Sequence, residues 1–175
     1  MSTRASVLTT TCFFHAGGFL TPLELTENAI QVCFNHSEDL DLTDTCEAIY
    51  KEIDQFKPNY LMFGSHHLIL LSNQPPKDKT LDLSSVYMVM PLGSTVPKDL
   101  YEILKKPFPN LVCCFNVLGM TEISTAFTMT NTVKHLGGVG AGSVLKLVDP
   151  ETGKLCGPGE VGEILIKPEA HTNGK

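Results

Sequence analysis

The chain of 175 residues carries 13 Lys and Arg against 19 Asp and Glu, which gives a net charge of −6 at pH 7. This acidic balance lacks the basic surface that nucleic-acid-binding domains present to phosphates, and no apolar run reaches the roughly 20 residues that span a bilayer. At 42% hydrophobic and 18% charged residues, the composition is typical of a globular chain that buries one core.

Short runs rich in β-branched and aromatic residues predict the strands of the first two thirds of the chain. Several of these runs are separated by longer amphipathic segments and by turns rich in Gly, Pro or Asp. The predicted strands cover residues 6–14, 29–35, 58–64, 84–94 and 109–119.

Three helices are predicted between the strands, at residues 41–56, 65–73 and 97–108. The first is the clearest, because apolar residues such as Ile49 and Ile53 recur every three or four positions and would share one face. The third begins with Pro97, at the position that opens many helices. This alternation of strands and helices implies a parallel sheet covered by helices.

Glycine-rich turns separate two short alternating strands in the last part of the chain, at residues 143–148 and 162–167. The segments DPETG and GPGE supply turns, so these strands are expected to pair antiparallel. The glycine cluster at 137–142 precedes a strand rather than a helix, which favours a bend over a phosphate-binding loop. The expected fold class is therefore α/β: a partial parallel sheet flanked by helices in residues 1–130, then a small antiparallel β region in residues 131–175.

The six cysteines are spaced irregularly and form no C-x-x-C pair. This usage favours reduced, mostly buried thiols and hence an intracellular chain. A zinc site that joins Cys113 or Cys114 to His66 and His67 is the alternative, but neither pair has the spacing of a zinc finger.

The segment GMTE follows the apolar run at 109–119 and is the first candidate site. Gly119 would let a ligand approach the backbone closely. The Thr121 hydroxyl could donate to a phosphate oxygen, and the Glu122 carboxylate could bind magnesium, which prefers oxygen ligands. We expect this segment at the carboxyl end of a parallel strand, where α/β sheets bind ligands. The alternative is a turn with an exposed Thr and Glu, and four residues alone do not decide between the two.

Two more predicted strands end in glycines or polar residues. The turn PLGST at 91–95 follows one strand, and His15 with two glycines behind it follows another. Together with GMTE, these ends could line one rim and form a ligand slot. His15 taken alone is either a hydrogen-bonded core histidine or a site residue.

The order of these motifs resembles the adenylate-forming, or AMP-binding, enzymes: acyl-CoA synthetases, 4-coumarate–CoA ligase-like enzymes and insect luciferases. The resemblance rests on FFH followed by glycines, a Gly-Ser turn, GMTE and VDPETGKLCGPGEVGEILIK, and it covers nearly the whole chain. In that family a carboxylate attacks the α-phosphate of ATP, and the resulting acyl-adenylate passes its acyl group to a thiol. The resemblance thus implies ATP and AMP, Mg²⁺, coenzyme A as co-substrate, and a small carboxylic acid, fatty or aromatic, as partner.

The resemblance also implies roles for particular residues. Thr121 would contact the α-phosphate and Glu122 would bind magnesium. His15 would line the acyl pocket near the reacting carboxylate, and Gly119 and Met120 would shape the mouth of that pocket. Gly93 and Ser94 would lie against the adenine, and the opposite wall would be formed by Asn116, Val117, Leu118, Gly119 and Met120.

The chain departs from the family pattern at three positions of the expected adenine slot. Leu118 stands where an aromatic residue usually stacks on adenine, and Val117 replaces a usual glycine. Leu92 stands before Gly93 where the family usually has another glycine, and its side chain could crowd the slot.

Two family segments have no counterpart in the 175 residues. The phosphate loop with its lysine would precede TTTCFFH, and the ribose-binding Asp and the lid domain with its catalytic lysine would follow EVGEILIKPEAHTNGK. The resemblance therefore implies a central fragment with little or no adenylation by itself. The alternative is a non-catalytic acyl- or nucleotide-binding or regulatory remnant. The family resemblance also implies that the protein is located in the cytoplasm or in peroxisomes, although the final segment HTNGK contains no peroxisomal tripeptide.

Overall fold

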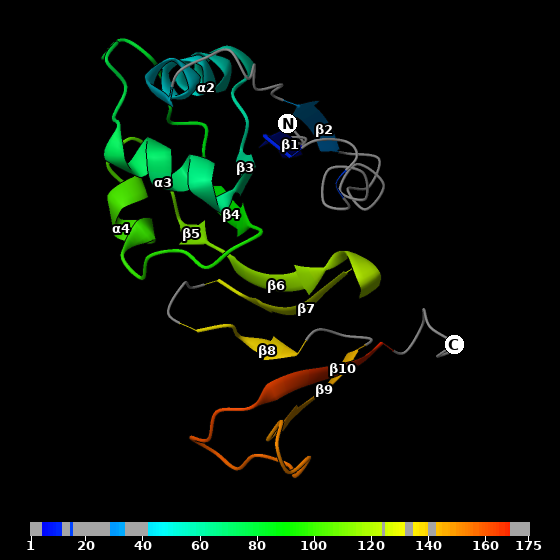
Figure 1. The fold of residues 1–175 in the computed structure, drawn as a ribbon. Coiled ribbons are helices and arrows are strands. Elements are labelled where there is room, and N and C mark those ends of the chain that lie inside the picture. The colour runs from blue at the N-terminus through cyan, green and yellow to red at the C-terminus, as the bar shows by residue number, and fades with distance from the viewer. Residues whose placement is uncertain are drawn as a thin grey trace.

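The computed structural model describes residues 5–11, 15, 29–33, 42–123, 125–131, 135–139 and 143–168. Figure 1 shows a parallel sheet accompanied by helices, a three-stranded antiparallel sheet, and a pair of antiparallel strands near the C-terminal end. This mixed architecture confirms the predicted α/β class. None of the helices in the described ranges is long and apolar enough to cross a membrane.

The parallel sheet has five strands in the order β2-β1-β3-β4-β5, and every neighbouring pair is parallel. The register places Leu8 of β1 opposite Leu61 of β3, and Leu61 opposite Val89 of β4. These three side chains are fully buried, as expected for the face of a sheet that helices cover. The strands are β1 (Ala5–Thr9), β2 (Ala29–Cys33), β3 (Tyr60–Gly64), β4 (Met88–Leu92) and β5 (Cys113–Cys114).

The three predicted helices are present as α2 (Leu42–Phe56), α3 (Ser65–Asn73) and α4 (Leu100–Leu104). The apolar face predicted for α2 is buried, and its members are Cys46, Ile49, Tyr50 and Ile53. The prediction for α4 was too long, because Pro97 does not open this helix. The Leu100 amide donates to the Pro97 carbonyl at 3.1 Å, so 97–100 forms a turn that precedes the helix.

One buried cluster fills the space between the parallel sheet and its helices. Phe63 of β3, Leu68 of α3 and Leu104 of α4 are all fully buried in it. Burying a side chain of this size contributes about 1.5–3 kcal/mol, so this cluster is the main source of stability in the chain. The Tyr50 hydroxyl lies inside it and donates to the Leu71 carbonyl at 2.9 Å.

The predicted strand at 109–119 is wrong as a single element. The Phe115 amide still donates to the Val89 carbonyl of the parallel sheet at 2.8 Å, but β6 (Asn116–Met120) pairs antiparallel with β7 (Thr125–Thr130). β7 in turn pairs with β8 (Gly138–Val139). The chain changes sheets because β7 follows after one short turn, the 3-10 segment Thr121–Ile123, and so gives β6 a close hairpin partner.

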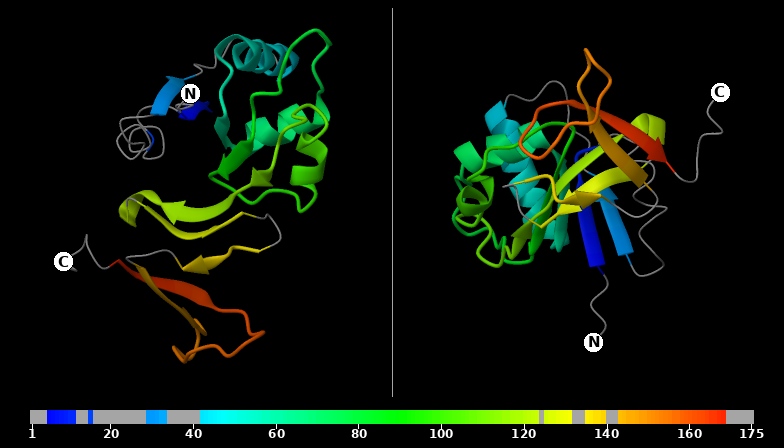
Figure 2. Two further views of the ribbon diagram at one scale, coloured as in Figure 1. Left: turned by 180° about the vertical axis from the view of Figure 1, so that it is seen from behind. Right: turned by 90° about the horizontal axis from the view of Figure 1, so that it is seen from below.

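The two strands predicted near the C-terminal end are confirmed to within one residue. β9 (Ser143–Val148) pairs antiparallel with β10 (Glu163–Pro168). Figures 1 and 2 show β6 and β7 between this pair and the helix-covered sheet. Antiparallel pairing begins at β6, whereas the division of the chain at residues 130 and 131 stays a prediction.

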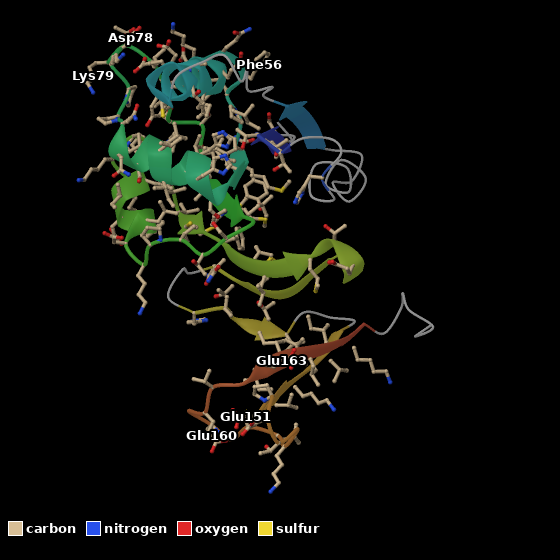
Figure 3. All side chains as sticks on the ribbon, viewed as in Figure 1. Phe56, Asp78, Lys79, Glu151, Glu160 and Glu163 are labelled. Carbon is tan, nitrogen blue, oxygen red and sulfur yellow. The ribbon has the colours of Figure 1, made fainter. Side chains whose placement is uncertain are left out.

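The connection from β9 to β10 is built from local turns. The Asp149 carboxylate accepts the amides of Glu151 at 2.8 Å and Thr152 at 3.1 Å. These bonds hold the pKa of Asp149 below its ordinary value, as expected for a carboxylate that accepts backbone amides. Figure 3 shows Glu151 and Glu160 at this end of the molecule, far from Asp78 and Lys79 at the opposite end. The two hydrogen bonds to its carboxylate show that Asp149 stabilises the turn after β9.

The described cysteines have free thiols: Cys46 and Cys114 are buried, and Cys113 and Cys156 are partly buried. Burial raises the pKa of Cys114 to about 12, so this thiol stays protonated and unreactive at neutral pH. Cys12 and the side chain of Cys33 lie outside the described residues. In the described part of the chain no three His, Cys, Asp or Glu side chains gather as metal ligands do, so the zinc alternative finds no support.

Candidate functional site

A cleft lies where three parallel strands end. Thr10 follows β1, Gly64 is the last residue of β3, and Leu92 is the last residue of β4. Because the strands are parallel, their carboxyl ends meet at one edge of the sheet, the usual ligand-binding edge of this fold class. The cleft has a volume of about 340 Å³ and is lined by Thr10, Thr11, His15, Gly64, His66, Leu92, Gly93 and Ser94.

The cleft brings together three of the predicted site residues, His15, Gly93 and Ser94. His15 is exposed, so the alternative of a core histidine is wrong. Leu92 is half-buried and also lines the cleft, while its effect on an adenine slot stays a prediction. The residues predicted at these two strand ends therefore line the same cleft.

Gly93 has a backbone conformation that explains its residue type. Its φ of +88° lies in the left-handed region, which side chains with a Cβ rarely adopt. A Cβ at this position would meet no atom within 4 Å. Glycine is thus needed for the turn, and it leaves open space beside the backbone at the cleft.

Hydroxyl groups of consecutive threonines connect the end of β1 to β3 beside the cleft. The Thr9 hydroxyl donates to the Met62 carbonyl of β3 at 2.7 Å and accepts the Thr11 amide at 3.1 Å. The Gly64 amide donates to the Thr10 hydroxyl at 3.4 Å. The Thr11 hydroxyl oxygen is buried without a hydrogen-bond partner among the described residues, unlike the hydroxyls of Thr9 and Thr10.

The two adjacent histidines of α3 have different environments. His67 is only 6% exposed and its ring meets Phe63 edge-on at 6.4 Å between centroids. His66 is exposed and lines the cleft, and its ring centroid lies 3.9 Å from that of His67, with the two rings tilted by 42°. A Cβ at Gly64 would lie 2.7 Å from Cε1 of His66, so glycine at the end of β3 makes room for this ring.

The GMTE segment lies outside the lining of this cleft. Gly119 and Met120 end the antiparallel strand β6, and Thr121 and Glu122 are exposed on the 3-10 turn that follows. The prediction that this segment ends a parallel strand is therefore wrong, because the chain leaves the parallel sheet after Phe115. β6 nevertheless lies against β4, which ends in the Gly93 turn.

The rest of the predicted opposite wall forms the first part of β6. Asn116, Val117 and Leu118 are half-buried, and the Asn116 side-chain amide donates to the His135 carbonyl at 2.9 Å. The pairing with β7 shifts register between Leu118 and Gly119, as at a β-bulge. A bulge here turns the end of β6 and so sets the direction of the GMTE turn.

Magnesium at Glu122 would find few protein ligands nearby. Within the described ranges Glu122 belongs to no group of three metal-ligating side chains. Magnesium is commonly bound by one or two carboxylates, with substrate phosphates and waters as the other ligands. An exposed single carboxylate fits that mode of binding and does not fit a site made of protein ligands alone.

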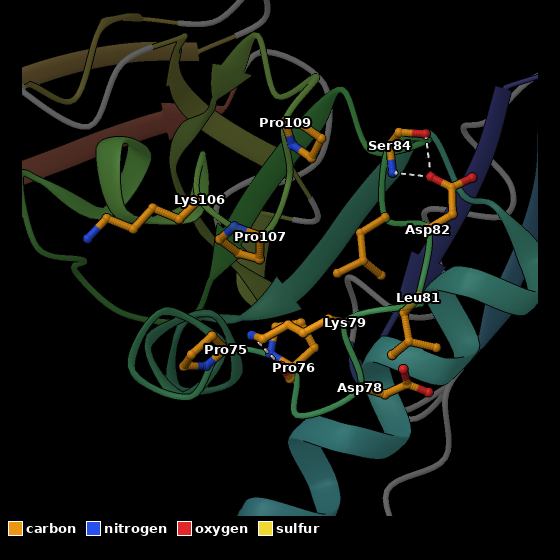
Figure 4. Close-up of a pocket in the computed structure, with 11 residues that line it drawn as sticks. Pro75, Pro76, Asp78, Lys79, Leu81, Asp82, Ser84, Lys106, Pro107 and Pro109 are labelled. Atoms are coloured by element: carbon orange, nitrogen blue, oxygen red, sulfur yellow. Dashed lines mark hydrogen bonds between the residues drawn. The ribbon is translucent and has the colours of Figure 1, made fainter.

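A second cavity, of about 450 Å³, lies among the connections that precede β4 and β5, at the amino edge of the sheet (Figure 4). Three of its charged groups already have hydrogen-bond partners: Asp82 accepts the amide and hydroxyl of Ser84, Asp78 accepts those of Thr80, and Lys79 donates to the Pro76 carbonyl. None of the predicted site residues lines it. The cleft at the carboxyl edge is therefore the better candidate, although it is the smaller of the two.

Residues missed by sequence reasoning are Thr10, Thr11, Gly64 and His66. Thr10 and Thr11 were assigned to the interior of a predicted strand, whereas β1 ends at Thr9. Gly64 ends a predicted strand, as the other site residues do, and so has the same sequence signal as the turn at Gly93. The adjacent His66 could have been found by the same signal.

Comparison with known proteins places the chain among enzymes. The pattern of the AMP-binding enzymes matches residues 1–174. Acyl-CoA synthetase 7 of Caenorhabditis elegans is 30% identical over 158 residues, 88% of this chain and 27% of that protein. Luciferin 4-monooxygenase of Photuris pensylvanica is 28% identical over 167 residues, 93% of this chain and 29% of that protein.

A solved structure agrees in fold. An anthranilate CoA ligase in complex with anthranoyl-AMP matches with a TM-score of 0.79 at 20% identity, over 95% of this chain and 32% of that chain. The chain thus spans less than a third of the length of each of these three proteins. The family match over almost the whole chain confirms the resemblance inferred from the motifs, and the chain belongs to the AMP-binding enzyme family.

Proposed function

We propose that this chain contributes the acyl- and nucleotide-binding cleft of an acid–thiol ligase. In the first step a carboxylate oxygen attacks the α-phosphorus of ATP, the bond from that phosphorus to the bridging oxygen breaks, and pyrophosphate leaves. In the second step the thiol of coenzyme A loses its proton and attacks the acyl carbon, and AMP leaves. The acid is a small carboxylic acid, fatty or aromatic.

One observation carries the proposal: His15, Gly93 and Ser94 line a single cleft at the carboxyl edge of the sheet. These residues come from two separate strand ends of a chain that matches the AMP-binding family. The acid-activating relatives, and the anthranoyl-AMP held by the anthranilate CoA ligase, support an acyl-adenylate as the ligand of this cleft.

The proposed residue roles follow the two sides of the cleft. The acyl group would lie toward His15, and the adenine would lie against the open backbone at Gly93 and Ser94. The other adenine wall would be 116–120 of β6, and the position of β6 against β4 supports this arrangement. Thr121 would donate to the α-phosphate, which requires the nucleotide to reach from the cleft to the turn after β6.

In the first step an anionic carboxylate approaches an anionic phosphate. Magnesium and hydrogen-bond donors to the phosphate would reduce the repulsion between these two anions. Glu122 is the proposed magnesium ligand, with phosphate and water oxygens completing the shell. Magnesium would supply charge neutralisation at the phosphates. The chain's own contribution is to hold the acid, the adenine and the α-phosphate in reach of one another.

The test is calorimetric titration of the 175-residue chain with 5′-O-(N-acylsulfamoyl)adenosines, in which a sulfamoyl group replaces the phosphate. Decanoyl and cinnamoyl versions represent fatty and aromatic acids. We expect at least one of them to bind about tenfold or more tightly than AMP, because the acyl group adds apolar contact worth 1.4 kcal/mol or more, on the order of one decade in affinity.

Two variants of the cleft and one control sharpen this test. His15→Ala and Gly93→Val should each weaken binding about tenfold. Lys106→Ala should not change it, because Lys106 is exposed and lines the cavity at the opposite edge. The proposal fails if the folded chain binds neither compound, or if Lys106→Ala weakens binding as much as His15→Ala does.

We further expect binding without appreciable turnover from these 175 residues alone. The sequence contains no Ser/Thr/Gly-rich loop with a lysine to grip the phosphates, and loss of such a group costs orders of magnitude in rate. ATP–pyrophosphate exchange that depends on the acid would contradict this expectation.

The cytoplasm or peroxisomes are the proposed compartments, to be checked by imaging of the tagged protein.

A further inference from the structure

A buried hydroxyl lies directly behind the Gly93 turn. Ser65 is the first residue of α3 and is only 1% exposed. Its hydroxyl oxygen lies 2.9 Å from the Leu92 carbonyl oxygen and 2.9 Å from the Ser94 carbonyl oxygen. One side chain therefore contacts the backbone carbonyls of both residues that flank Gly93.

The shape of the turn explains this double contact. The left-handed backbone at Gly93, with φ of +88°, brings two carbonyls from alternate residues to the same side. The serine hydroxyl has a single hydrogen, which these two acceptors share in a three-centre bond. Both bonds are part-buried, and a carbonyl in such a place is not fully compensated by water when it loses its donor, so the hydroxyl favours this turn over other conformations of the same residues.

Ser65 contacts the Gly93 turn from the side opposite to the cleft. Gly64 ends β3 and is paired with Leu92 at the end of β4, so Ser65 begins α3 beside the point where the Gly93 turn begins. The turn is exposed on its other side, at Gly93 and Ser94, and lines the cleft there. Ser65 contacts the turn from the protein side and does not line the cleft itself.

We propose that Ser65 is a positioning residue, whose hydroxyl holds the Gly93 turn in the shape that the cleft presents to its ligand. Its effect on the ligand rests on the proposed function, because the adenine is the group expected to lie against Gly93 and Ser94. Its effect on the turn does not depend on that function. The two effects can therefore be measured separately.

The first arm measures amide hydrogen exchange without ligand, in the wild type and in Ser65→Ala. We expect exchange in residues 92–96 to rise about tenfold, the equivalent of 1.4 kcal/mol, while exchange in α2 and β3 stays unchanged. Ser72→Ala is the matched control, because Ser72 is also in α3 and donates only to the Ile69 carbonyl of the same helix, at 2.7 Å.

The first arm has clear contrary results. Unchanged exchange in residues 92–96 of Ser65→Ala would overturn the proposal. An equal rise across α2, β3 and the turn would also overturn it, because it would show a general loss of stability. A rise of the same size in 92–96 in Ser72→Ala would have the same meaning.

The second arm measures binding of decanoylsulfamoyl and cinnamoylsulfamoyl adenosine by the same variants. We expect Ser65→Ala to weaken binding about tenfold and Ser72→Ala to leave it unchanged. Binding by the wild type with no loss in Ser65→Ala would overturn the ligand part of the proposal. If the folded wild type binds neither compound, the proposed function fails, while the exchange arm still decides whether Ser65 holds the turn.

Discussion

Single hydroxyl groups join neighbouring elements in the helix-covered sheet. Thr9 connects β1 to the Met62 carbonyl of β3, and Tyr50 connects α2 to carbonyls at the end of α3. Both residues are fully buried. A buried carbonyl that loses its donor costs about 1–3 kcal/mol, more than the net value of an average hydrogen bond. At the residue scale, these contacts fix how β1 meets β3 and how α2 meets α3.

Tyr50→Phe tests one such contact. The substitution removes a hydroxyl that donates to the Leu71 carbonyl at 2.9 Å and the Gln74 carbonyl at 3.1 Å, and it should lower the free energy of unfolding by roughly 1–3 kcal/mol. Tyr101→Phe is the control, because its hydroxyl bond to the Val112 carbonyl is exposed, and it should lose less than half as much. Urea unfolding measures both, and equal losses would contradict the account.

The lowered pKa of Asp82 predicts that the stability of the fold depends on pH. Hydrogen bonds from the Ser84 side chain and amide, followed by the bond from Lys57, lower the pKa of Asp82 from 3.8 to about 2. A carboxyl with a lowered folded pKa stabilises the fold above its unfolded pKa, and that contribution is lost as the pH falls through the folded value. It should thus be complete above about pH 4 and disappear between about pH 4 and pH 2.

The measurement for Asp82 is the urea midpoint of the wild type and of Asp82→Asn from pH 6 to pH 2. The wild type should be the more stable protein at pH 6, and the two curves should approach each other below about pH 4. A constant difference between the curves down to pH 2 would show that Asp82 does not titrate as described.

The β9–β10 hairpin shows how one residue of the family motif shapes an element. A Cβ on Gly162 would lie 2.5 Å from Sγ of Cys156 and 2.7 Å from the Val148 carbonyl oxygen. Both distances are too short for a real contact, so the strand and its connection could not keep their present approach. At Gly157 the nearest atom, Oε2 of Glu160, would be 3.6 Å away, an ordinary contact.

At the element scale, Gly162→Ala should therefore loosen the hairpin while Gly157→Ala should not. We expect amides of β9 and β10 to exchange about tenfold faster in Gly162→Ala, since overpacking costs roughly 1–3 kcal/mol. Gly157→Ala should stay close to the wild type, within about 0.5 kcal/mol. Equal exchange in the two variants would mean that the close approach at Gly162 does not govern the hairpin.

Elements with a local signal could be predicted from the sequence, and elements chosen by distant partners could not. α2 and α3 follow from spacing and length, and β9 and β10 follow from alternation between turns. The switch of the chain from β5 into β6 depends on hydrogen bonds to Val89 and to β7, which no local pattern contains. For the same reason the GMTE segment was placed in the wrong sheet.

At the scale of the whole molecule, the main buried cluster lies in one part of the chain, and most of the exposed large apolar side chains lie in another. All members of the main buried cluster lie between Leu8 and Cys114. The hairpin contributes Val148 to the buried residues, and it exposes the large apolar side chains Val144, Leu147, Leu155, Val161, Ile164 and Leu165. Stability is therefore concentrated in the helix-covered sheet, which also forms the cleft.

The candidate site was predicted in part. The rule that ligands bind where parallel strands end identified His15, Gly93 and Ser94, which share the cleft. It missed the Thr10–Thr11 pair, because the end of β1 could not be set to within a few residues. The hydroxyl of Ser65 was not predictable, because its two acceptors lie about thirty residues away and are brought near only by the pairing of β3 with β4.

The most direct test of the central claim is to locate the bound ligand. Amide hydrogen exchange of the 175-residue chain, with and without decanoylsulfamoyl or cinnamoylsulfamoyl adenosine, reports which segments the compound protects. The account predicts protection at Thr10, Thr11 and His15 and in residues 92–96, the segments that contain the lining of the cleft. Protection of residues 75–84 and 106–109, which contain the lining of the opposite cavity, or no protection of a folded chain, would contradict it.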